Sequence, residues 1–258
     1  MHRPTFEGGP LSPDGPDSAA LQARSKGLAA VTGEVVDCFR CPRLVAWREQ
    51  AALEPPARYA DESYWARPLP GWGPVDARVL MVGLAPAAHG GNRVGRIFTG
   101  DRSGDFLFAA LHATGFATQP ESVVPGDGLR PIDLYIAAVN RCAPPGNRPT
   151  PLERDTCLSY LVRELALLSD VRIIVALGAY AWDGILRALA RGGSGSLATA
   201  VRPRPVFGHG AEVAIGPYVL LGSFHPSQQN TFTRKLTQAM LQGLLLRVRE
   251  LAGLPLRP

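Results

Sequence analysis

The chain has 258 residues, 46% of them hydrophobic, and a formal net charge of +5 from 27 basic and 22 acidic side chains. This length suits one substantial domain, and the composition excludes a fibrous or largely disordered protein. No apolar run approaches the roughly 18 residues of a membrane helix, so we expect no membrane contact. The excess positive charge, almost all of it arginine, fits a polyanionic partner without identifying one.

The N-terminal part differs in composition from the rest. Residues 1–30 are rich in Pro, Gly, Ser and Ala without clear periodicity, which predicts a disordered leader followed by a single domain over residues 31–258. The start of the chain has no charged-then-apolar signal segment, which predicts a cytoplasmic protein. Glu34–Phe39 then predicts a short helix, and Pro42 suits the first turn of a second one.

Strand-like and helix-like segments alternate through the rest of the chain. The short apolar runs that predict buried strands are 78–83, 133–139, 171–177 and 218–222. Helices are predicted over 105–114, from the capping box at 150–153, over 179–190 and over 233–251, and a Gly/Ser/Pro-rich segment with a small hairpin over 191–216. This alternation predicts an α/β protein with three α/β/α layers and a four-stranded, mainly parallel sheet.

Ligands of such sheets bind in the crevice outside the carboxyl ends of the strands. The loops after the first, second and fourth predicted strands carry His89, Phe98, Asp101, Asn147 and His225. An aromatic ring, a carboxylate, an amide and imidazoles on one rim are suited to a small polar aromatic ligand. The loop after the third strand, 178–180, is short and is expected to contribute little.

The four cysteines form two spaced pairs, Cys38-x2-Cys41 and Cys142-x14-Cys157. Four thiolates make one complete ligand set for a tetrahedral zinc ion or a 4Fe-4S cluster. Disulfides would need an oxidising compartment, which the lack of a signal segment disfavours. A redox CxxC would begin a helix after a strand, whereas Cys38 follows the leader. Four unrelated buried thiols remain an alternative, but we favour a metal centre.

Three stretches of the chain resemble the motifs of family 5 uracil-DNA glycosylases. They read GLAPAAHGGNRVGRIFTGD, NRCAPPGNRPTP and HPSQQNTFTRKLT, and the resemblance extends over roughly residues 36–252. The four cysteines match the 4Fe-4S ligands of that group in order and spacing. The resemblance therefore implies a uracil-DNA glycosylase-like fold, a structural 4Fe-4S cluster with zinc as the less favoured alternative, and a monomer that acts on DNA containing uracil or other deaminated bases.

The resemblance also implies which side chains perform the reaction. A monofunctional glycosylase flips the damaged nucleotide out of the duplex and hydrolyses its N-glycosidic bond. The base leaves as an anion, and a donor such as His225 would stabilise it. Asp101 would stabilise the oxocarbenium-like sugar and orient the attacking water. Their structural alternatives are a helix cap for Asp101 and a brace of the HPS turn for His225.

Further residues are expected to hold the flipped base. Phe98 would stack on it, Asn147 would read its polar edge, and the loop bearing Gly83, Ala85 and His89 would line the pocket. Phe98 has the alternative of an apolar anchor for its loop, and Asn147 that of an ordinary turn residue. His89 has a structural alternative as well.

The third motif is expected to contact the duplex. Gln228, Gln229 and Asn230 would enter the minor groove and fill the vacated base position. Arg234 and Lys235 are predicted to begin the terminal helix and to bind phosphates, although cations at a helix N-terminus oppose the helix dipole.

Two departures from the related family 4 pattern concern substrate range. Family 4 has a uracil-reading asparagine where this chain has Ala138, and an acidic residue where this chain has Ala85-Pro86. A pocket without these groups predicts a broad range that includes hypoxanthine, xanthine and ethenocytosine besides uracil. The alternative function is a non-catalytic, metal-stabilised nucleic-acid-binding or redox-sensing module on the same scaffold.

Overall fold

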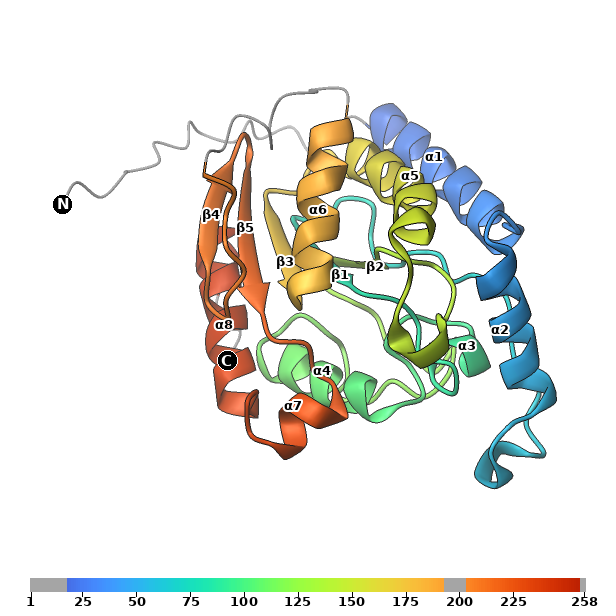
Figure 1. Ribbon diagram of the computed structural model, residues 1–258. Coiled ribbons are helices and arrows are strands. Elements are labelled where there is room, and N and C mark those ends of the chain that lie inside the picture. Colours follow the sequence, from blue (N-terminus) through green and yellow to red (C-terminus); the bar gives the residue numbers. More distant parts are fainter. Residues whose placement is uncertain (1–17, 193–202, 256–258) are drawn as a thin grey trace.

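A five-stranded sheet forms the middle layer of the computed structural model, which describes residues 18–192 and 203–255 (Figure 1). The strand order is β2-β1-β3-β5-β4; the first four strands run parallel and β4 is an antiparallel edge. The strands are β1 (Val79–Gly83), β2 (Leu134–Ala138), β3 (Ile173–Leu177), β4 (Glu212–Ile215) and β5 (Tyr218–Ser223).

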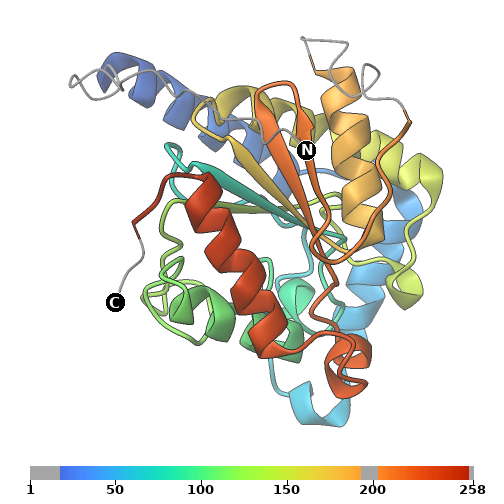
Figure 2. The ribbon, with the colours of Figure 1, turned by 90° about the vertical axis from the view of Figure 1, so that its left-hand side faces the viewer.

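Helices cover both faces of the sheet, because side chains alternate between the faces along each buried strand. Met81 and Val175 pack with α4 and α8 on one face, whereas Leu80 and Ile174 pack with α1, α5 and α6 on the other. Figure 2 shows α8 and α6 on opposite sides of the sheet. The helices are α1 (Ser18–Val36), α2 (Pro42–Leu53), η1 (Ala57–Tyr59), α3 (Gly91–Val94), α4 (Arg102–Ala113), η2 (Pro145–Asn147), α5 (Pro151–Leu167), α6 (Ala179–Arg191), α7 (Gln228–Phe232) and α8 (Gln238–Leu251). The predicted three-layer α/β/α architecture is confirmed.

The predicted number of strands was one too low. β4 pairs antiparallel with β5 through a turn at Gly216, which has a φ of +56°. An edge strand buries little, and only Ile215 of β4 is buried, so its sequence lacks the continuous apolar run that marked the other strands.

The prediction of a disordered leader was wrong for residues 18–30. They belong to α1, which packs on α5 through the buried side chains of Leu28, Val31 and Val35. Arg24 pairs with Asp170 at 2.7 Å across this contact. Ala, Gly and Ser between these few apolar positions obscured the helical period. Residues 1–17 lie outside the described residues.

The terminal helix predicted over 233–251 begins later than expected, and a separate short helix, α7, precedes it. α7 ends at Phe232, and α8 begins at Gln238 after the N-cap Thr237, whose hydroxyl accepts from the amide of Met240 at 3.2 Å. Arg234 lies between them with a φ of +57°, a backbone conformation that no α-helix accommodates. Arg234 and Lys235 therefore lie in an interhelical turn and not at a helix N-terminus.

Other local predictions are confirmed. The hydroxyl of Thr150 accepts from the amide of Glu153, whose carboxylate accepts from the Thr150 amide, so α5 begins with a capping box. Pro42 begins α2 as expected. Among the described residues, no helix is long and apolar enough to cross a membrane.

Candidate active site

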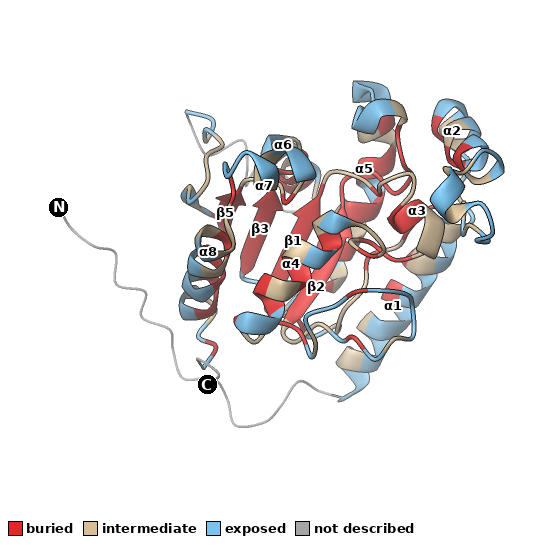
Figure 3. Cartoon of the chain, turned by 90° about the horizontal axis from the view of Figure 1, so that it is seen from below, coloured by how far each residue is buried: buried red, intermediate tan, exposed pale blue. Residues whose placement is uncertain are grey.

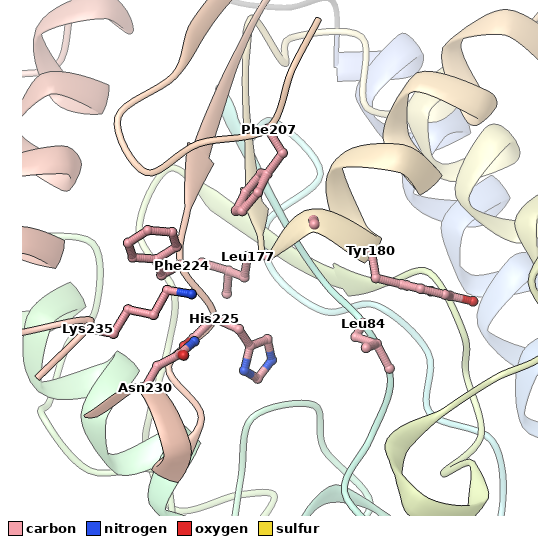
Figure 4. A pocket seen from close by; sticks show the side chains of 10 residues that line it. Leu84, Leu177, Tyr180, Phe207, Phe224, His225, Asn230 and Lys235 are labelled. Atoms are coloured by element: carbon pink, nitrogen blue, oxygen red, sulfur yellow. The ribbon is translucent and has the colours of Figure 1, made fainter. Parts of the chain in front are cut away.

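A pocket of about 290 Å³ opens beside the carboxyl ends of β3 and β5 (Figure 4). Figure 3 views this edge of the sheet, with α7 near β5. The pocket is where the crevice rule for parallel sheets places a ligand. The residues that line it are Leu84, Leu177, Gly178, Ala179, Tyr180, Phe207, Phe224, His225, Asn230 and Lys235.

His225 lies in this pocket, two residues after the end of β5. Burial lowers the pKa of its imidazole to about 4, so the ring is neutral at physiological pH. The side-chain amide of Asn230 donates to the backbone carbonyl of His225 at 2.9 Å, which fixes the turn that carries the imidazole. A neutral imidazole can donate one N–H hydrogen bond without carrying a charge.

Phe98 stands next to His225, with the two ring centroids 5.9 Å apart. Its backbone is in the left-handed region, with a φ of +55°, which is a strained conformation for a large side chain. The ring covers Gly83 so closely that a Cβ there would lie 2.7 Å from Phe98 Cζ. Gly104 likewise leaves room for the Phe98 carbonyl, 2.3 Å from its would-be Cβ. Strain maintained by close packing is frequent at functional sites.

Asp101 is the N-cap of α4. Its Oδ1 accepts from the amides of Ser103 and Gly104, at 2.8 and 3.0 Å. The capping interpretation is therefore confirmed, but it uses one oxygen only. The other, Oδ2, faces Gly90 closely enough that a Cβ there would lie 2.1 Å away, and no described residue donates a hydrogen bond to it. Burial raises the pKa of this carboxyl, and the two amide hydrogen bonds oppose the rise.

A buried ion pair holds the loop that carries Phe98 and Asp101. Arg96 binds both carboxylate oxygens of Asp127, at 3.0 and 2.7 Å, and donates to the Thr99 hydroxyl at 2.9 Å. Burial of Asp127 is outweighed by Arg96 and by backbone amides, which keep the pKa of that carboxyl well below its usual range. The Phe98 ring and the Asp101 carboxylate thus lie on a loop that this ion pair supports.

The remaining base-binding candidates are less clearly placed. His89 Nδ1 is 2.9 Å from the Tyr64 hydroxyl, and burial, Arg58 and Arg93 lower the pKa of the imidazole. Asn147 is exposed in η2 with a φ of +56°. Ala85 is half-buried on the loop after β1. None of the three lines the pocket beside His225.

The residues expected to contact DNA separate into two groups. Gln228 and Gln229 are exposed on α7, as a groove-contacting role requires. Asn230 instead turns back toward His225 and lines the pocket. Arg234 and Lys235 are both exposed in the turn after α7. Lys235 also lines the pocket, with its Nζ 4.8 Å from the centroid of the Phe224 ring.

Several pocket residues were missed from the sequence. The loop after β3 was expected to contribute little, yet Gly178, Ala179 and Tyr180 form one wall. The crevice rule applied to this loop as well would have found them. Phe224 is adjacent to His225 and could have been found in the same way. Phe207 comes from the segment before β4, and no local signal in the sequence marks it.

Comparison with known proteins bears on this arrangement. The family model described as the uracil DNA glycosylase superfamily matches residues 70–249, more than half of the chain. The chain belongs to the uracil DNA glycosylase superfamily. The resemblance drawn from the three motifs is confirmed, and membership of an enzyme family disfavours the alternative of a non-catalytic module.

Several relatives that cover most of the chain are named type-5 uracil-DNA glycosylase. The chain is 52% identical to the type-5 uracil-DNA glycosylase of Mycobacterium tuberculosis over 84% of this chain and 79% of that protein. It is 47% identical to the type-5 uracil-DNA glycosylase of Mycobacterium leprae, over 91% of this chain and 100% of that protein. It is also 47% identical to the type-5 enzyme of Thermus thermophilus, over 84% and 94% of the two chains.

The cysteines of this superfamily member lie away from the pocket but close to each other. All four are free and line one cavity between the α1–α2 junction and the β2–α5 connection. Cys142 and Cys157 are buried, and Cys38 and Cys41 are half-buried. In residues 18–192 and 203–255, no three His, Cys, Asp or Glu side chains are arranged around a single ion position.

The surroundings of the cysteines are basic. Arg48 is fully buried and donates to Cys142 Sγ at 3.3 Å, while its own Nε has no hydrogen-bond partner in the described chain. The backbone amide of Arg141 donates to Cys157 Sγ at 3.3 Å. Burial raises the pKa of the Cys142 thiol to about 11 and that of Cys157 to about 12. The hydrogen-bond donors at these sulfurs and the guanidinium group of Arg48 would stabilise thiolates. The site therefore fits a metal ion or cluster that binds thiolates.

Proposed function

We propose that the protein is a monofunctional DNA glycosylase that hydrolyses the N-glycosidic bond of uracil and of other deaminated or damaged bases, leaving an abasic site. The observation that supports this most directly is the neutral imidazole of His225 in a pocket beside the ring of Phe98. The names of the relatives agree with this activity.

His225 acts on the leaving base in this proposal. As the C1′–N bond breaks, its electron pair moves to the base, and negative charge develops on a carbonyl oxygen. An N–H of the neutral imidazole donates to that oxygen and lowers the barrier without transferring a proton. The pKa of about 4 supports this role, because an imidazolium would not be the resting form.

Asp101 acts on the sugar. Its capped Oδ1 fixes the carboxylate, and Oδ2 is left to orient a water toward C1′ and to stabilise the oxocarbenium-like transition state. The water oxygen bonds to C1′, and its proton passes to the carboxylate and then to solvent or the departed base.

Phe98 and the neighbouring loops hold the flipped base. The ring of Phe98 stacks on it. Gly83 ends β1, and Ala85 and His89 belong to the loop that follows. Asn147 reads the edge of the base from its exposed position in η2, outside the pocket lining. Ala138 is Cα-paired with Gly83 at the ends of β2 and β1 and is buried, so it offers the base no polar group. This apolar position supports a range that includes hypoxanthine, xanthine and ethenocytosine.

The DNA duplex is bound along α7 and the turn after it. Gln228 and Gln229 enter the minor groove from exposed positions, and Arg234 binds a phosphate. Asn230 supports the turn that carries His225, because its side-chain amide donates to the His225 carbonyl. In this proposal the protein is cytoplasmic and monomeric, and light scattering tests the monomeric state.

Cys38, Cys41, Cys142 and Cys157 hold a structural 4Fe-4S cluster in this proposal, with zinc as the alternative. Such a cluster supplies no redox step here; it crosslinks the α1–α2 junction to the β2–α5 connection. Arg48 supplies positive charge to the thiolates. Iron analysis and broad absorbance near about 400 nm distinguish the cluster from zinc.

A panel of oligonucleotides tests the proposed function. Single- and double-stranded DNA with one uracil, hypoxanthine, xanthine or ethenocytosine is treated with protein, and abasic sites are detected by alkaline cleavage. We expect release of uracil and of at least one other base. His225→Ala should lose about 100- to 1000-fold in rate, whereas His112→Ala, on an exposed part of α4, should not. Release of none of these bases would reject the function, and release of uracil alone would reject the broad range.

A further inference from the structure

Lys235 occupies an unusual position for a DNA-binding lysine. It is one of only two lysines in the chain, and its ammonium group points into the pocket that holds His225 (Figure 4). Within the described ranges, no carboxylate lies at ion-pair distance from its Nζ. Lys235 and its neighbour Arg234 are both exposed in the turn, but only Lys235 also lines the pocket.

The ammonium group is held by an aromatic ring that is itself fixed. Nζ lies 4.8 Å from the centroid of Phe224, which is a cation–π contact. On Phe224, the imidazole of His209 stacks with centroids 5.2 Å apart, and His209 Nδ1 accepts from the Phe224 amide at 3.2 Å. The lysine is therefore directed at the pocket by packing around Phe224.

The charge balance of the reaction gives this position a purpose. Negative charge develops on the leaving base, and His225 is neutral, so its imidazole provides a dipole but no compensating charge. The pocket walls near Lys235 are largely apolar, from Leu177, Phe207 and Phe224. A cation acts more strongly across such walls than in water.

We propose that Lys235 is a catalytic residue whose ammonium group stabilises the anion of the leaving base together with His225. This inference rests on the proposed glycosylase function and revises the phosphate-binding role expected for this residue. No proton is transferred by Lys235: the C1′–N bond breaks, its electron pair goes to the base, and water adds to C1′. The lysine interacts with the charge that forms.

The test compares two leaving groups in single-turnover base release, with enzyme in saturating excess over a duplex containing uracil or 5-fluorouracil. Lys235→Met removes the charge and keeps most of the chain length. We expect it to slow uracil release about 10- to 100-fold. The loss should be smaller for 5-fluorouracil, whose anion needs less stabilisation. Lys235→Arg should recover part of the rate.

The salt dependence of DNA binding separates this role from a phosphate contact. A phosphate-binding lysine contributes about 1 to the slope of log affinity against log salt concentration. We expect Lys235→Met to leave that slope unchanged, whereas Arg234→Met should reduce it. Lys26→Met, on an exposed part of α1, is the matched control and should alter neither rate nor slope.

Each result has a defined meaning. An unchanged rate in Lys235→Met, or an equal loss for both bases with a reduced salt slope, overturns the proposal. If Lys235→Met fails to fold by circular dichroism, Lys235→Gln is used in its place under the same criteria. Wild-type protein that releases no base rejects the glycosylase function itself, whereas active wild type with a normal Lys235→Met rejects only the role of the lysine.

Discussion

The pocket beside His225 and the cavity lined by the four cysteines both use residues that closely follow a parallel strand, yet their polar groups are held differently. Around the cysteines, Arg48 and the Arg141–Glu164 ion pair are almost fully buried. Around the pocket, His225 and Lys235 have few partners within the described chain and face open space.

This difference separates stability from chemistry. Rearranging buried charges that contact each other costs much free energy, so we expect the cysteine region to hold its parts of the chain in fixed positions. Pocket groups with unused hydrogen-bonding capacity are available to a ligand. We therefore expect substitutions in the cysteine region to change the stability of the fold, and substitutions in the pocket to change the rate of base release.

Asp101→Asn should give the largest loss of activity. Asn caps a helix as well as Asp does, so the melting temperature should hardly change, while the rate of base release falls about 1000-fold because the carboxylate charge is lost. Single-turnover kinetics and thermal unfolding measure the two effects. Asp105→Asn, in the next part of α4, is the control for a nearby exposed carboxylate. A variant that keeps its rate would leave Asp101 with capping alone.

Cys142→Ser should affect stability most. Loss of one ligand should remove the absorbance near about 400 nm, and it leaves buried Arg48 beside a neutral hydroxyl. We expect a loss of about 3–5 kcal/mol, which lowers the melting temperature by at least about 6 °C in a domain of this size. Thr156→Ser lines the same cavity without contributing a sulfur and should keep the iron. Unaltered iron content in Cys142→Ser would argue against this ligand set.

Phe98→Ala should weaken the binding of the flipped base. Stacking on an aromatic ring contributes about 1–3 kcal/mol per base, which corresponds to a loss of about 5- to 150-fold in kcat/KM. Phe98→Leu keeps apolar contact with Gly83 but has no ring, so its loss should be nearly as large. If Phe98→Leu were as active as wild type, the ring would serve only as an anchor for its loop.

The pH dependence of base release distinguishes the proposed roles of Asp101 and His225. Asp101 must be ionised, and burial raises its pKa, so the rate should fall as pH decreases through a value above that of an ordinary aspartate. His225 is already neutral well above about pH 4 and should add no change between about pH 6 and 8. Single-turnover rates across this range give the profile. A rate that decreases as pH rises through about 6.5 would require an imidazolium instead.

Gly83→Ala should have the smallest effect. Its Cβ would lie 2.7 Å from Phe98 Cζ, so the ring must move, and we expect a loss of about 1–3 kcal/mol in stability with a few-fold lower rate. Gly243→Ala in α8 is the matched control, because a Cβ there meets nothing within 4 Å. Equal behaviour of the two variants would show that the Phe98 ring is not confined by Gly83.

Much of the fold was predictable because its signals are local. Four buried strands appear as short apolar runs, and the capping box at Thr150 and Glu153 is a spacing of two residue types. The edge strand β4 and residues 18–30 of α1 were missed, since each buries only a few side chains. Few buried positions leave little periodicity to detect.

The candidate site was predictable to the extent that one rule covers it. The carboxyl ends of parallel strands indicated the loops of Phe98, Asp101 and His225, and motif resemblance indicated their roles. The wall formed by Phe207 was not predictable, because it depends on how the segment before β4 packs against the end of β5.

The sequence by itself determined most of the order of elements, the four cysteines, the family and the loops that carry Asp101 and His225. Only the tertiary structure decided where those side chains point. It directs Lys235 into the pocket and Asn230 back to His225, and it leaves Asn147 exposed away from the pocket lining. The physical reason is that side-chain direction follows from backbone conformation and packing, such as the left-handed turns at Phe98 and Arg234, which no pattern of residue types specifies.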